Sequence, residues 1–129
     1  MNEEFIVKAQ VLQEQSRESE EHLQLIKQQV SELEQFRKTL IDFDSTESKE
    51  ILSSLGKGVY AKASVTGKDL FVGVGADIYV KKTSVETIKV IEEQLKMLNE
   101  ARMELLARVE SYGLAFKELL SEIQMAKGK

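Results

Sequence analysis

The stretch VTGKDLFVGVGADIYVKKT, residues 65–83, decides the fold because its pattern breaks with everything around it. Apolar side chains alternate with other residues over 70–74 and again over 78–80, which is the two-residue period of a β-strand. The segment Gly75-Ala76-Asp77 separates the two runs and is short enough for a hairpin turn. On both sides of this region, apolar residues recur at helical spacing. The sequence therefore predicts a small β-rich insert between two helices.

The same alternation precedes this stretch. GVYAKASV (58–65) reads as a further strand, and KEILSSLG (49–56) reads as a weaker one. Short joints at 56–58 and 66–68 contain glycine, so residues 49–82 are expected to form two consecutive β-hairpins. Four short strands leave edges with unpaired backbone groups, and we expect those edges to pair with other subunits. The expected oligomerisation residues are Val59, Ala61, Ala63, Val65, Leu70, Val72, Val74, Ile78 and Val80.

Each flanking segment carries a coiled-coil seam, in which apolar residues are spaced alternately by four and three. Eight of eleven seam positions are apolar in the first segment, and ten of eleven in the second. A mean spacing of about 3.5 residues kept over about five heptads is narrower than the apolar face of a globular helix. The first seam comprises Phe5, Ala9, Leu12, Ser16, Ser19, Leu23, Ile26, Val30, Leu33, Arg37 and Leu40; the second comprises Ile88, Ile91, Leu95, Leu98, Arg102, Leu105, Val109, Tyr112, Phe116, Leu119 and Ile123.

The two seams have equal lengths of about 53 Å at a rise of 1.5 Å per residue, as an intramolecular antiparallel pair requires. Folding back from the insert pairs residues whose numbers sum to about 128, for example Leu23 with Leu105. We expect an α+β fold: a long antiparallel two-helix coiled-coil hairpin with two β-hairpins inserted between the helices. Residues 1–129 would form one domain, with helices over 1–43 and 84–126. The arginines at seam positions 37 and 102 are expected to select register.

Near both chain ends, the apolar residues exceed what a two-helix seam can hide. Such a surplus forms an exposed patch that binds apolar partners, and methionine repacks readily against varied sequences. The alternative is that these residues only close the coiled coil. The candidate binding residues are Phe5, Ile6, Val7, Val11, Leu12, Phe116, Leu119, Leu120, Ile123 and Met125.

One level of the seam is weak. Ser16 and Ser19 take seam positions, and the pairing sum sets them opposite Val109 and Tyr112, with Gly113 alongside. Two hydroxyls in place of apolar side chains remove about 3–6 kcal/mol of burial. We expect the outer part of the helix pair to hinge or fray here; ordinary seam imperfection is the alternative.

Composition excludes several function classes. The chain of 129 residues has a net charge of −4, divided as about −6 over 1–47, +3 over 48–83 and −1 over 84–129. A net-acidic chain without an arginine- or lysine-rich run does not suit nucleic acid. The chain has no cysteine, no basic and apolar start typical of a signal peptide, and no run of about 20 apolar residues. We expect a cytoplasmic protein that does not interact with membranes.

No catalytic, cofactor or metal site is expected. GVGADI lacks the third glycine of a dinucleotide loop, and a strand rather than a helix follows it. His22 is the single histidine, and the glutamates lie mostly outside the seams, where a two-helix pair offers no pocket to perturb their pKa. The chain is therefore interpreted as a non-enzyme that needs no cofactor.

LGKGVYAKASV (55–65) followed by DLFVGVGADIYVKKTSVETIKVIEEQL (69–95) resembles the α-class subunit of prefoldin, most like the archaeal form. The resemblance covers essentially the whole chain, and two hairpins mark the α class. Ser53-Ser54 departs from the Val-Pro usual in that family.

The resemblance implies a hexamer of two α- and four β-class subunits whose hairpins form a common body. It also implies that the helix ends hold unfolded proteins and that these pass to a group II chaperonin without ATP. The alternative function is a structural coiled-coil spacer, or a filament former that assembles through the same hairpins.

Overall fold

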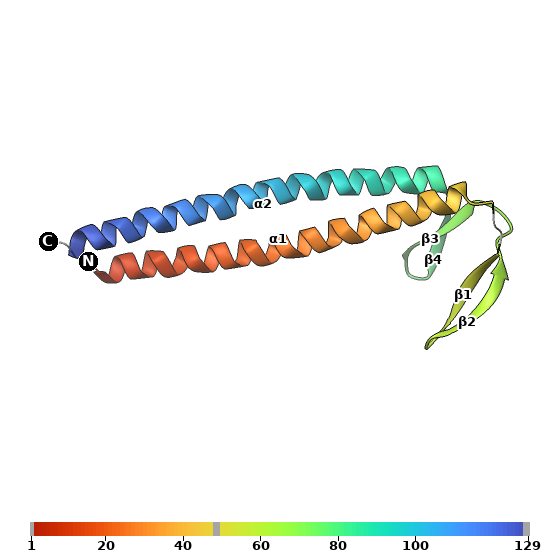
Figure 1. The fold of residues 1–129 in the computed structure, drawn as a ribbon, viewed down its shortest axis with the longest axis horizontal. Coiled ribbons are helices and arrows are strands. Elements are labelled where there is room, and N and C mark those ends of the chain that lie inside the picture. The colour runs from red at the N-terminus through yellow and green to blue at the C-terminus, as the bar shows by residue number, and fades with distance from the viewer. Residues whose placement is uncertain (1, 48–49, 128–129) are drawn as a thin grey trace. The chain divides into compact units, whose positions relative to one another are not determined.

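Along the chain, a long helix is followed by two β-hairpins and then by a second long helix (Figure 1). The computed structural model describes residues 2–47 and 50–127; Met1 and Lys49, which open two of the expected segments, lie outside the described residues. The elements are α1 (Asn2–Ser45), β1 (Glu50–Gly56), β2 (Val59–Ser64), β3 (Asp69–Gly75), β4 (Ile78–Thr83) and α2 (Ser84–Lys127). This order confirms the predicted α+β class, with both hairpins inserted between the helices.

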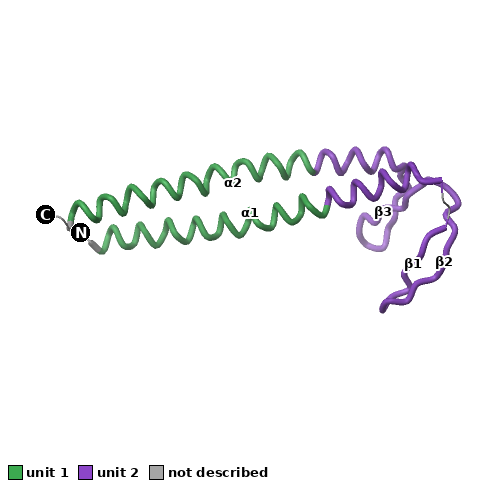
Figure 2. The backbone as a smooth tube through the Cα atoms, in the orientation of Figure 1, with its two compact units in different colours: residues 1–32, 95–129 green, residues 33–94 purple. Residues whose placement is uncertain are grey.

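The chain divides into two compact units (Figure 2). Unit 1 comprises Met1–Glu32 and Leu95–Lys129, and its described residues, 2–32 and 95–127, are all helical. Unit 2 comprises Leu33–Gln94 and holds both hairpins with the adjoining turns of α1 and α2. Within each unit, the α1 segment lies antiparallel beside the α2 segment. The described part of unit 1 therefore offers helix surfaces, and unit 2 also offers strand edges.

The core of both units is the predicted seam. All twenty-two seam side chains are buried or half-buried, and among the other described side chains of α1 only Phe43 is withdrawn from solvent. In unit 2, the Arg37 Nε lies 3.3 Å from the Glu92 Oε1, an ion pair without hydrogen-bond alignment. In unit 1, Val11 and Glu118 line one groove. Both pairs have numbers that sum to about 129, close to the register of about 128 predicted from the sequence.

Helix α2 begins with Thr83 as its N-cap. The Glu86 backbone N–H donates to the Thr83 hydroxyl at 3.1 Å, and the Thr87 hydroxyl donates to the Thr83 carbonyl at 2.9 Å. The sequence T-x-x-E supplies this arrangement, because the side chain of the N-cap satisfies an N–H that has no partner within the helix. Strand β4 therefore passes into α2 without a loop.

The hairpins form two separate antiparallel two-stranded sheets, β1–β2 and β3–β4. Ser53 and Ser54 lie within β1, in register with Ala61 and Tyr60. Each sheet has a register shift just before a two-residue turn, at Ser54/Gly56 and at Gly73/Gly75. The turn residues have positive φ, as type I′ hairpin turns require. A two-stranded hairpin is marginally stable in water on its own, so these sheets depend on further contacts.

The linker between the hairpins is fastened to the end of α1. The last turn of α1 carries no basic residue, and Lys68 supplies the missing positive charge from the linker. The Lys68 ammonium donates to the carbonyls of Phe43, Asp44 and Thr46 at 2.9, 3.2 and 2.8 Å, and it lies 5.3 Å from the centre of the Phe43 ring. A cation that binds free carbonyls at a helix C-terminus also complements the helix dipole. Lys68 therefore caps α1 and anchors the linker.

Lys68→Met keeps most of the aliphatic stem and removes these three hydrogen bonds. We expect a loss of about 1 kcal/mol of unfolding free energy and faster amide exchange over residues 40–46. Lys57→Met, in the first turn, is the matched control. Equal exchange at the end of α1 in both variants would contradict the capping role.

Ala76 occupies the left-handed region with φ +50°, where a Cβ costs about 1 kcal/mol. Asn tolerates this region, so Ala76→Asn is expected to raise the unfolding free energy by about 0.5–1 kcal/mol in thermal or urea unfolding. Ala61→Asn, inside β2, should destabilise instead. A destabilised Ala76→Asn protein would show that this turn does not adopt the described conformation.

Candidate protein-binding surfaces

The tip of unit 1, which we define as residues 3–12 of α1 with 115–126 of α2, divides the ten candidate residues into two sets. The seam members are withdrawn from solvent: Leu119 is buried, with 7% of its surface exposed, and the others are half-buried. The residues beside the seam are exposed, up to 71% for Met125. The half-buried members are Phe5, Leu12, Phe116 and Ile123; the exposed members are Ile6, Val7, Val11, Leu120 and Met125.

A groove of about 380 Å³ opens on this tip between the two helices. Val7, Val11 and Leu12 line it from α1, and Ala115 and Leu119 line it from α2. Three charged side chains, Lys8, Glu118 and Glu122, also line it. An open groove lined mainly by apolar side chains is suited to take apolar side chains from another polypeptide.

Both α1 and α2 are continuous helices through the weak level of the seam. Ser16 and Ser19 are half-buried at their seam positions, and α1 runs through them without a break. On the outer face, Arg17 donates to Glu14 and, at 2.7 Å, to Glu21. The hydrogen bond from Arg17 holds the pKa of the Glu14 carboxyl below its ordinary value, so the contact weakens only as pH falls through that lowered pKa. This surface network supports α1 where its seam contacts are poorest.

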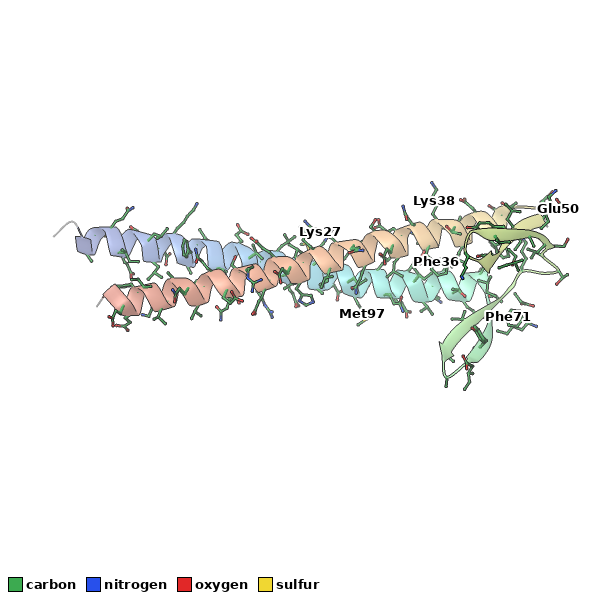
Figure 3. The ribbon with its side chains drawn as sticks, turned by 90° about the horizontal axis from the view of Figure 1, so that it is seen from below. Lys27, Phe36, Lys38, Glu50, Phe71 and Met97 are labelled. Atoms are coloured by element: carbon green, nitrogen blue, oxygen red, sulfur yellow. The ribbon has the colours of Figure 1, made fainter. Side chains whose placement is uncertain are left out.

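The hairpins of unit 2 expose apolar side chains on both faces. Of the nine expected assembly residues, Ala63, Val65, Leu70 and Val72 are half-buried; the exposed ones are Val59, Ala61, Val74, Ile78 and Val80. The opposite face was missed from the sequence and is at least as exposed. It carries Leu52 and Tyr60 on the first hairpin and Phe71 and Tyr79 on the second, and Phe71 is labelled in Figure 3. The sequence did hold a signal for this face, because the residues at the alternate strand positions, between the expected ones, include large apolar and aromatic side chains.

Other chemistry finds no support among the described residues. Residues 2–47 and 50–127 hold no group of three or more His, Asp or Glu side chains able to bind a metal ion. Neither described helix has an apolar stretch long enough to cross a membrane. Exposed apolar side chains gather at the tip and on the two hairpins, and others are scattered along the helices, as at Leu25 and Met103.

Comparison with known proteins agrees with this geometry. The family model described as "Prefoldin subunit" matches residues 12–129. The chain belongs to the prefoldin family. It is 35% identical over 112 residues to prefoldin subunit alpha of Thermofilum pendens, covering 83% of this chain and 84% of the relative. It is 28% identical over 116 residues to prefoldin subunit alpha 1 of Methanocaldococcus jannaschii, covering 83% and 82%.

A solved structure shares the fold. The filamentous PFD from Methanocaldococcus jannaschii, determined by cryo-electron microscopy, aligns with a TM-score of 0.72 at 19% identity and covers 88% of this chain and 96% of that one. Prefoldins are chaperones and not a family of enzymes, and the resemblance to archaeal α subunits predicted from the sequence is confirmed.

If the serine level loosens the outer seam, amide exchange should be about tenfold or more faster over residues 5–15 than over 26–36. Replacing Ser16 and Ser19 together by Leu should slow the outer exchange, because it restores two apolar seam contacts. Serine to leucine at the exposed Ser31 is the control. Equal exchange in the two stretches of the unaltered protein would leave only an imperfect seam.

Proposed function

We propose that this prefoldin subunit is an ATP-independent holdase that binds non-native polypeptides at the tip of unit 1 and passes them to a group II chaperonin. The observation that carries the proposal is the exposed apolar set beside the seam, together with the groove that it lines. A coiled coil needs none of these side chains for its own pairing. No step of such holding requires catalysis or a cofactor.

The mode of binding follows from the chemistry of the tip. The exposed side chains are aliphatic or methionine and carry no hydrogen-bonding group, so they select apolar surface rather than sequence. A single patch of this size binds weakly, and several tips joined in one assembly gain affinity through avidity. Non-native proteins, which expose many apolar segments, are the partners that this arrangement favours.

The partners that complete such an assembly are prefoldin β-class subunits, with two α and four β chains as the proposed composition. The single domain of residues 1–129 would then supply one helical arm and, through residues 49–82, part of the common body. Exposed apolar side chains on the separate two-stranded sheets support this division of roles. We propose the cytoplasm as the compartment.

A structural coiled-coil spacer or filament former is the second candidate function. It is favoured by one observation, the fold shared with a filamentous prefoldin. A spacer would assemble through the hairpins in the same way but would need no surplus apolar side chains at the tip. The two candidates therefore differ in what the tip does.

The tip is tested by replacing Val7, Val11, Leu120 and Met125 together by Ser. We expect the variant, assembled with an archaeal β-class subunit, to lose most of its suppression of aggregation of a denatured protein, measured by light scattering. The control replaces Leu25 and Met97 by Ser; these are 59% and 69% exposed on unit 1 but lie outside the tip (Met97 in Figure 3). Helicity and assembly should stay unchanged in both.

Deletion of residues 1–12 and 117–129 gives a second test in the same aggregation assay. If the shortened protein protects as well as the full chain, the tip is not the binding site. If the full assembly itself gives no protection, the spacer function is favoured instead.

A further inference from the structure

The groove at the tip of unit 1 differs in charge between its two sides. From α1 it is lined by aliphatic side chains, among them Val7, which is 57% exposed, and by a single lysine, Lys8. From α2 it is lined by two small or aliphatic side chains and by two carboxylates, Glu118 and Glu122. The groove therefore combines a mainly apolar lining with one positive and two negative charges.

The positive charge of the groove is already paired on its own helix. The Lys8 Nζ lies 3.9 Å from the Glu4 Oε1, one turn earlier on α1, and this order of glutamate before lysine is the favourable one. Among residues 2–47 and 50–127, the ion pairs include neither Glu118 nor Glu122. The two carboxylates on α2 are therefore the charges of the groove that have no partner within the described part of the chain.

The two carboxylates also repel one another. Glu118 and Glu122 are four residues apart, so their side chains lie on the same face of α2, about 6 Å apart along its axis. Like charges at this spacing weaken a helix, and both side chains are exposed. The seam residues Leu119 and Ile123 pair the helices at this height, so the carboxylates are not needed for that pairing. A cation placed against them relieves the repulsion.

We propose that the groove selects apolar segments flanked by lysine or arginine, whose charges meet Glu118 and Glu122, over equally apolar segments with acidic flanks. This rests on the proposed function and names the class of client that the tip prefers. The apolar side chains of the client supply most of the affinity, because their burial is worth more than an exposed ion pair. Charge then discriminates between clients of equal hydrophobicity.

Such segments are a common feature of unfolded proteins. Charged residues often flank the apolar runs that are most prone to aggregate, and a part of these flanks is basic. An acidic flank meets the opposite situation at this groove, since Glu118 and Glu122 repel it and Lys8 is shared with Glu4. The tip therefore favours one subset of the aggregation-prone segments.

The test measures how flanking charge changes cross-linking at this tip. The chain carries a photoreactive amino acid at position 7 and is assembled with an archaeal β-class subunit. It is then titrated with three peptides that share one apolar core and are flanked by lysine, glutamine or glutamate. At low salt, we expect half-maximal cross-linking of the lysine-flanked peptide at a concentration about tenfold below that of the glutamate-flanked one. This ratio should fall towards one as salt is added, because both carboxylates are exposed and are screened by ions.

Variants assign the preference to the two carboxylates. Glu118→Gln with Glu122→Gln should bring the ratio close to one, and Glu118→Lys with Glu122→Lys should reverse the order of the peptides. Glu104→Gln with Glu110→Gln is the matched control, because these are exposed carboxylates of α2 in unit 1 but outside the tip. The control should keep the tenfold ratio. Helix content by circular dichroism should be the same in all three variants.

The outcomes separate charge selection from the proposed function. Equal cross-linking of the three peptides, or a lysine variant that still prefers basic flanks, would overturn the selection and leave the holdase standing. Absence of cross-linking with every peptide would overturn the tip as a binding site and the selection with it. An assembly that shows the preference but does not suppress aggregation of a denatured protein would overturn the holdase alone.

Discussion

A two-helix coiled coil can hide only one side chain in about every 3.5, and that limit governs this chain. Every seam position is withdrawn from solvent, while most of the described residues between them stay exposed whatever their chemistry. Over most of α1 and α2 those residues are charged or amide side chains. At the tip of unit 1 they also include valine, isoleucine, leucine and methionine, which the fold has no means of covering, and exposed apolar side chains such as Leu25, Met97 and Met103 occur farther along the helices as well. The surplus apolar surface is thus a direct consequence of where the sequence departs from the coiled-coil pattern.

A related limit applies to the hairpins. A two-stranded sheet has two faces and two edges, and within unit 2 the two sheets are not joined to each other. Apolar side chains on both faces therefore point to burial by partner subunits, as the prefoldin family relationship also suggests. The anchoring of the linker by Lys68 restrains the joint between the hairpins without covering either sheet. The tip and the hairpins therefore expose apolar surface for different reasons. The tip has no third helix to cover it, and each hairpin has no second layer.

The sequence predicted the seam and the strand order well, because both rest on local periodicity. Ser16 and Arg37 were placed in the seam by spacing alone, and both are withdrawn from solvent there. The sequence also predicted which tip residues are surplus to the seam, since that follows from the same spacing. Which of them contact a client stays a prediction.

Less local features were not predicted. An alternation of period two gives each hairpin two faces, and it does not tell which face is exposed: Tyr60 and Phe71 are at least as exposed as the aliphatic residues of the opposite face. The bonds from Lys68 to the end of α1 span more than 20 residues, and no pattern along the chain encodes them.

The central claim is that the tip contacts the client. The most direct measurement is photo-cross-linking of an assembled subunit to a denatured protein, with a photoreactive amino acid placed at position 7 of the tip or at position 97 on the exposed flank of α2. We expect strong cross-linking from position 7 and little from position 97. Equal cross-linking from the two positions, or cross-linking from position 97 alone, would contradict it.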